Sequence, residues 1–250
     1  MMPLTPVPKN QSHKLAVALK QVKVIGFDLD DTLWPNHDVI SAAVFEQNNY
    51  LQQQLSNLSI DDISRQLNAI VLELTVQDAV GYQDMTRLRL AALAQFCQTH
   101  RLPAAVAEEA FARFFQRRQQ VNLFDHTIPL LSSLQSKGFI LVAISNGNVD
   151  LEQVGIRHYF SGHWRAGCDG LAKPSGDMLT AACRQYAVES AQLLYVGDSE
   201  KYDVAAARDA GSWVALIADT SAGSADSQAD FQFATLAAFY QATQEALAKH

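Results

Sequence analysis

The stretch from Val24 to Trp34, which reads VIGFDLDDTLW, constrains the fold of this chain more than any other. Its apolar beginning gives way to Asp28 and Asp30, a pattern typical of a buried strand whose carboxyl end opens into a loop. Side chains two positions apart on a strand point the same way, so these two aspartates are expected to project together. Carboxylates held that close repel each other unless a cation neutralises them or one takes up a proton. The alternative is a strand followed by an Asp-capped helix or an Asx turn.

A helical pattern covers residues 36–124 without interruption by any strand pattern. Apolar residues recur in it at helical spacing, which predicts a bundle of about four helices. After this block, apolar strands are predicted at Phe139–Ile144, Leu193–Val196 and Trp213–Ala218, with helices between them. This alternation is the signature of βαβ units. The sequence therefore predicts an α/β fold with a Rossmann-like parallel-sheet core and an all-helical domain inserted after the first strand.

The predicted domain boundaries follow from this change of pattern. Residues 1–21 are expected to form a loose N-terminal arm with a short helix over Lys14–Gln21. The α/β core is expected to comprise residues 22–35 and 125–250, and the helical insertion residues 36–124.

Composition narrows the class of protein. The net charge of −7 comes without any block of lysine or arginine, which disfavours nucleic-acid binding. The three cysteines, Cys97, Cys168 and Cys183, are scattered and lack metal-type spacing, which suits a reducing compartment. No segment approaches the roughly 20 apolar residues that would cross a bilayer. A cytoplasmic enzyme that does not associate with membranes is the resulting expectation.

Polar clusters follow three of the predicted strands. The first strand leads to Asp28 and Asp30, the next to Ser145–Gly147, and a later one to Asp198. Parallel strands present their carboxyl ends along one edge of a sheet, so these groups are expected to converge there. Taken alone, Ser145–Gly147 is more typical of a turn.

Two further charged residues accompany these clusters. Lys173 is kept out of a helix interior by Pro174, and Asp203 lies five residues beyond Asp198. Each also has an ordinary interpretation, because Lys173 alone suits a solvated lysine and Asp203 suits the start of a helix.

The ordered set of motifs resembles the haloacid dehalogenase superfamily of phosphatases and phosphotransferases. The matching motifs are Asp-x-Asp-x-Thr at Asp28–Thr32, Ser-Asn at Ser145–Asn146, Lys-Pro at Lys173–Pro174 and Gly-Asp-x-x-x-x-Asp at Gly197–Asp203. The resemblance covers roughly residues 22–218, with the helical block in the place of the family's cap. More narrowly, three short segments resemble the YigB-type flavin-pathway phosphatases: Thr86–Arg87, Ser145–Asn148 and Arg165–Gly167.

The resemblance implies phosphomonoester hydrolysis through an aspartyl-phosphate. Asp28 is then the nucleophile. Asp30 donates a proton to the leaving group and later accepts one from water. The phosphoryl group is bound by Ser145, Asn146 and Lys173. Of these three, Ser145 and Lys173 are also catalytic residues.

The resemblance also implies Mg²⁺ as the cofactor, since this cation prefers oxygen ligands. The Asp28 and Asp198 carboxylates and the Asp30 backbone carbonyl are the expected ligands. Asp203 is expected to orient Lys173 or a metal-bound water instead of binding the metal directly.

A small phosphorylated metabolite is the expected partner, with flavin mononucleotide or a phosphorylated riboflavin precursor as the leading candidates by resemblance. The chain itself is expected to be a monomer or a weak homodimer. Three alternatives remain: a sugar phosphomutase, a carbon–halogen hydrolase and a non-catalytic phosphate-binding protein on the same scaffold. The presence of Asp30 argues against the carbon–halogen hydrolase.

Residues of the helical block and its connection are given ordinary roles. Trp34 is expected to pack between core and cap, with contact to substrate as the alternative. Solvated positions are expected for four arginines, Arg87, Arg89, Arg117 and Arg118. For Arg87 and Arg89 the alternative is contact with an anionic or planar substrate.

Overall fold

The computed structural model describes residues 9–218 and 227–248, so residues 1–8 of the expected arm lie outside the described part. Within the described residues, six parallel strands form one sheet in the order β3-β2-β1-β4-β5-β6. The strands are β1 (Val24–Phe27), β2 (Ile140–Ser145), β3 (Gly162–Arg165), β4 (Leu193–Gly197), β5 (Trp213–Ile217) and β6 (Phe231–Phe233). The central strand β1 is buried along its whole length between β2 and β4. The predicted α/β fold with a parallel sheet is confirmed.

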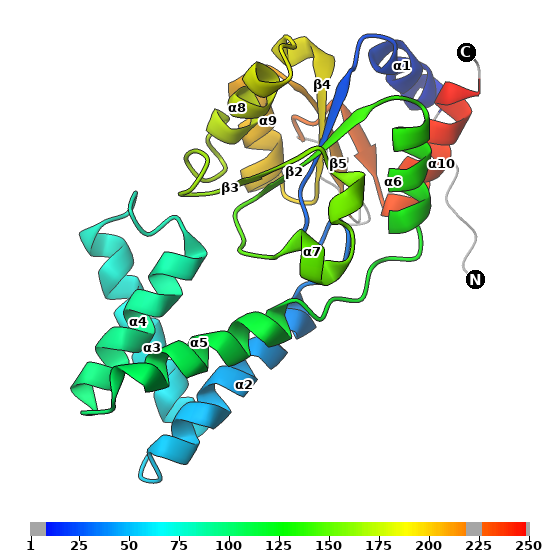
Figure 1. The fold of residues 1–250 in the computed structure, drawn as a ribbon. Coiled ribbons are helices and arrows are strands. Elements are labelled where there is room, and N and C mark those ends of the chain that lie inside the picture. The colour runs from blue at the N-terminus through cyan, green and yellow to red at the C-terminus, as the bar shows by residue number, and fades with distance from the viewer. Residues whose placement is uncertain (1–8, 219–226, 249–250) are drawn as a thin grey trace.

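Helices cover both faces of the sheet (Figure 1). On one face, Ile25 and Phe27 of β1 belong to an apolar cluster formed with side chains of four helices. These helices are α1 (Lys9–Leu19), α6 (Thr127–Ser136), α7 (Leu151–Val154) and α10 (Leu236–Leu247). On the other face, Val24 belongs to a second apolar cluster formed with side chains of α8 (Asp177–Gln185) and α9 (Ala205–Ala210). Because side chains of β1 alternate between these two apolar layers, the strand has no solvent-facing side.

Four helices lie between β1 and α6, as the uninterrupted helical pattern of residues 36–124 predicts. They are α2 (His37–Gln54), α3 (Ile60–Gln77), α4 (Met85–Thr99) and α5 (Ala104–Arg118). Figure 1 shows them as a bundle beyond the end of the sheet where the chain leaves β1. The bundle has an apolar core of its own, which includes Leu51, Ile63 and Phe96. Ser59 and Asp62 form a reciprocal capping box at the start of α3, which fixes where that helix begins.

Two features differ from the sequence-based expectations. The described part of the N-terminal arm is a helix, α1, which packs against α10 with Leu15 completely buried, so this part is not loose. Strands β3 and β6 at the two sheet edges were not predicted, because neither contains an apolar run of four residues.

No helix among the described residues is both long enough and apolar enough to cross a membrane.

Candidate active site

The carboxyl ends of the central strands border a cleft of about 280 Å³. The loop after β1 contributes Asp28 and Asp30, the last position of β2 contributes Ser145, and the loop after β4 contributes Asp198. Lys173 enters the same cleft from the segment between β3 and α8. The structure therefore brings together polar groups that lie far apart in the sequence, at the sheet edge where parallel strands end.

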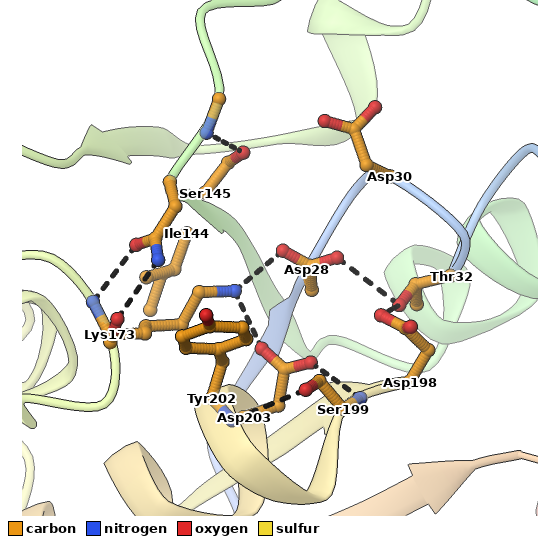
Figure 2. Close-up of polar contacts among 12 residues, drawn as sticks. Asp28, Asp30, Thr32, Ile144, Ser145, Lys173, Asp198, Ser199, Tyr202 and Asp203 are labelled. Carbon is orange, nitrogen blue, oxygen red and sulfur yellow. Dashed lines mark hydrogen bonds and ion pairs between the residues drawn. The ribbon is translucent and has the colours of Figure 1, made fainter. Parts of the chain in front are cut away.

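Lys173 is the centre of the buried polar network. Its Nζ donates to Asp28 Oδ1 at 2.5 Å, to Asp203 Oδ1 at 2.6 Å and to Tyr195 Oη at 2.8 Å. The Tyr195 hydroxyl in turn donates to the carbonyl oxygen of Ile144 at 2.8 Å. Three acceptors match the three N–H groups of a lysine ammonium, so the buried charge is fully hydrogen-bonded. Figure 2 shows Asp28 between two donors, with Lys173 on one side and Thr32 on the other.

The pKa values of these groups reflect burial and the clustering of carboxylates. Burial lowers the pKa of Lys173, but Asp28, Tyr195 and Asp203 outweigh it and raise that pKa well above 10.5. Burial raises the pKa of Asp28, with Asp203 adding to the effect and Lys173 opposing it. Burial also raises the pKa of Asp198 to about 6, with Asp203 as the next cause. The lysine remains charged, and the carboxylates around it outnumber it.

This surplus of negative charge fits a divalent cation. Carboxylate oxygens of Asp28, Asp198 and Asp203 lie within 4.8 Å of one another. These three groups and Lys173 sum to two uncompensated negative charges when all are ionised. Hard oxygen donors of this kind are the ligands that Mg²⁺ prefers. The residues present therefore fit the cation that the sequence led us to expect.

The carboxylates differ in how free they are to bind a cation. Asp203 is occupied, since its Oδ1 accepts from Lys173 and its Oδ2 accepts from the Ser199 backbone N–H at 2.9 Å. Asp28 Oδ2 and Asp198 Oδ1 face the Thr32 hydroxyl at 3.3 and 3.4 Å. Asp28 and Asp198 thus keep oxygens available for a metal, whereas Asp203 holds the lysine.

Gly197 is required by this arrangement. A Cβ at that position would lie 2.4 Å from Cγ of Asp203. Any other residue would displace the carboxylate that holds Lys173.

Asp30 does not join this cluster through its carboxylate. Both of its oxygens lie 2.6 Å from Arg118 Nη2, and Oδ1 also accepts from Trp34 Nε1–H at 3.0 Å. In Figure 2 its side chain lies apart from Asp28 and Asp198. The two aspartates therefore border one cleft, but a guanidinium neutralises the second one. The expectation of a solvated Arg118 is wrong, because this residue is 1% exposed.

Asn146 contacts the backbone of the lysine-bearing segment. Its Oδ1 accepts from the Lys173 backbone N–H at 2.9 Å, and its Nδ2 donates to the Lys173 carbonyl oxygen at 3.0 Å. The amide thus holds the lysine-bearing segment with one of its two N–H groups and its carbonyl oxygen, while Asn146 also borders the cleft. Ser145 lies beside it, 1% exposed, with its Oγ accepting from Gly147 N–H at 2.9 Å.

Sequence reasoning missed Tyr195 and Arg118 as parts of the site. Tyr195 lies inside the apolar strand β4 and resembles a core residue in the sequence. Arg118 ends a helix that also carries Arg113 and Arg117, and nothing in the sequence distinguishes it from these two.

A comparison with protein families places this chain among the hydrolases. Residues 22–211 match the model of the haloacid dehalogenase-like hydrolases, which is more than half of the chain, and the protein belongs to this family. The family resemblance drawn from the four motifs is thereby confirmed.

Individual relatives are similar over most of the chain. The 5-amino-6-(5-phospho-D-ribitylamino)uracil phosphatase YigB of Escherichia coli K12 is 32% identical over 77% of this chain and 82% of its own. A glyceraldehyde 3-phosphate phosphatase of Methanopyrus kandleri is 26% identical over 76% of this chain and 81% of its own. A 2-haloacid dehalogenase structure from Pseudomonas syringae pv. tomato DC3000 matches with a TM-score of 0.81 and 28% identity, covering 91% and 99% of the two chains.

Proposed function

We propose that this protein is a Mg²⁺-dependent phosphatase that hydrolyses small phosphomonoesters through an aspartyl-phosphate. The observation that carries the proposal is the Asp28 carboxylate, which borders the cleft with one oxygen 2.5 Å from Lys173 Nζ and the other near Thr32. A carboxylate that is fixed in this way and faces a site for a divalent cation can attack an anionic phosphate.

The residues divide the reaction between them. Asp28 attacks phosphorus and is released when water attacks in turn. Lys173 stabilises negative charge on the phosphoryl oxygens, with Ser145 as a further donor. Asp30 supplies a proton to the leaving oxygen and later removes one from the attacking water. Asp28, Asp198 and the Asp30 carbonyl would hold Mg²⁺, and the cation would supply positive charge beside the phosphate. Helices α2–α5 act as a cap that excludes water and selects the leaving group.

Mg²⁺ dependence tests this proposal directly. Chelation is expected to stop phosphate release from p-nitrophenyl phosphate, and added Mg²⁺ is expected to restore it. Release that continues unchanged in a chelator would contradict the metal assignment.

The reaction products distinguish the alternative functions. A phosphomutase would return an isomeric phosphate ester without free phosphate, and a binding protein would retain phosphate without turnover. A carbon–halogen hydrolase would release halide from a 2-haloacid, and Asp30 favours the phosphatase over it.

A cavity inside the cap supports a substrate with a single polar ring. It measures about 120 Å³ and lies between α2, α3 and α4. Because it is smaller than the roughly 150 Å³ cavity that holds benzene, it has no room for a fused three-ring flavin. Most of its wall is aliphatic, but Gln47, Asn48 and Arg89 bring amide and guanidinium groups to it. We therefore favour a phosphorylated ribitylaminopyrimidine of the riboflavin pathway over flavin mononucleotide.

Arg89 is the most informative residue of that cavity. Its guanidinium lies over the Phe114 ring at 3.6 Å, and its Nη1 donates to Gln47 Oε1 at 3.0 Å. No carboxylate pairs with it among the described residues. Burial, with Arg118 as the second cause, lowers the pKa of Arg89 to about 10. An incompletely paired guanidinium of this kind suits the carbonyl oxygens of a pyrimidine ring.

Arg89→Met tests the substrate assignment. Loss of a charge-assisted hydrogen bond is expected to lower kcat/KM for 5-amino-6-(5-phospho-D-ribitylamino)uracil by about 10-fold or more. Glycerol phosphate, which has no ring, is expected to be hydrolysed as before. Arg87→Met is the matched control, because Arg87 is exposed on the same helix. An equal loss with both substrates would contradict the assignment.

A further inference from the structure

Arg118 is a buried cation that joins the cap to the catalytic core. It is the last residue of α5, is 1% exposed, and places Nη2 2.6 Å from both oxygens of Asp30. Among the described residues, Asp30 is its one ion-pair partner. A buried charge must be paired, so the position of α5 and the orientation of Asp30 depend on each other.

The surroundings hold the Asp30 carboxylate at this point. Trp34, completely buried, donates Nε1–H to Asp30 Oδ1 at 3.0 Å. A Cβ at Gly147 would lie 2.9 Å from Asp30 Oδ2 and 3.5 Å from Arg118 Nη2. The loop after β1, the loop after β2 and the end of α5 therefore meet at one carboxylate, and the absence of a side chain at Gly147 leaves room for that meeting.

The ion pair with Asp30 does not use all of the buried Arg118 guanidinium. Its Nη1 is buried and has no hydrogen-bond partner among the described residues. Buried donors without partners are rare because they are costly, so this one calls for an explanation. Arg117, the preceding residue, is only half-buried and contacts a single backbone oxygen, that of Gln120. The difference between these neighbours singles out Arg118.

We propose that Arg118 is a positioning residue, which aims the Asp30 carboxyl group and thereby makes proton transfer depend on the docking of the cap. The inference rests on the proposed function and extends it to a residue of the cap. In the first half of the reaction the bond from Asp28 to phosphorus forms, the bond from phosphorus to the ester oxygen breaks, and protonated Asp30 gives its proton to that ester oxygen. In the second half Asp30 takes a proton from water as the new oxygen–phosphorus bond forms and the bond to Asp28 breaks. Arg118 stabilises the carboxylate that exists between these two transfers.

Leaving-group dependence distinguishes this role from a purely structural one. Arg118→Met is expected to lower kcat about 100-fold or more with glycerol phosphate, whose poor leaving group needs the proton. With p-nitrophenyl phosphate, whose leaving group departs without it, the loss is expected to stay below about 5-fold. Arg118→Lys is expected to recover part of the glycerol phosphate activity, and Arg117→Met is expected to match the parent protein.

A second measurement covers the case in which Arg118→Met unfolds because Asp30 is left unpaired. The double variant Asp30→Asn/Arg118→Met removes both charges. If Arg118 acts through Asp30, this variant is expected to be no slower with glycerol phosphate than Asp30→Asn alone. A further loss in the double variant, or an equal loss with both substrates in a folded single variant, would overturn the inference. A parent protein that releases no phosphate from either ester would instead refute the proposed function.

Discussion

Asp28→Asn is expected to lower kcat for phosphate release by about 10⁴-fold or more. An amide cannot form the acyl-phosphate bond, and loss of a covalent nucleophile in other enzymes costs turnover of this order. The fold is expected to persist, because burial already raises the pKa of Asp28 and disfavours its charged form. An uncharged side chain of the same shape relieves that cost and can still accept a hydrogen bond from Lys173.

Asp31→Asn is the matched control for this variant. Asp31 borders the same cleft but is exposed, and its Oδ1 accepts from Asn36 N–H at 2.8 Å, a bond that asparagine can also accept. Its backbone has a φ of 59°, a conformation that asparagine tolerates. Phosphate release and phosphoenzyme formation after rapid quenching are the measurements. A phosphoenzyme in Asp28→Asn, or retention of more than about one hundredth of parental turnover, would refute the nucleophile assignment.

The backbone framework of the site could be predicted because the central strands have strong local signals. Each central strand is an apolar run that ends abruptly in polar residues, as Val24–Phe27 does before Asp28. Parallel pairing then fixes which ends meet. The edge strands β3 and β6 lack such runs, since β3 is half-buried and β6 has three residues. Their pairing depends on neighbours that the local sequence does not specify.

Side-chain partners were harder to predict than strand ends. Asn146 follows a strand, as expected, but its amide binds the backbone of Lys173, 27 residues later in the chain. The contact between Arg118 and Asp30 spans 88 residues. Such contacts depend on how loops and cap are packed, and a single sequence contains no local pattern that reports them. The partners of Asn146 and of Arg118 therefore could not be predicted from the sequence.

Lys173→Met is expected to affect stability as strongly as activity. The variant leaves Asp28 and Asp203, both buried, without the ammonium that now pairs with them at 2.5 and 2.6 Å. Removing one partner of a buried ion pair typically costs about 3–5 kcal/mol of unfolding free energy. Chemical denaturation without Mg²⁺ measures this loss. A variant as stable as the parent would show that the lysine is not needed to balance these carboxylates.

The double variant Lys173→Met/Asp203→Asn separates the lysine's two roles. It removes one positive and one negative charge, so the net charge of the cluster is unchanged and only Asp28 and Asp198 remain as carboxylates. Much of the lost stability is expected to return, as a coupling energy between the two positions. Activity is not expected to return, because the phosphoryl oxygens still lack the ammonium. If activity returned with stability, Lys173 would serve to hold the fold, and transition-state charge would be stabilised by the metal and the remaining donors.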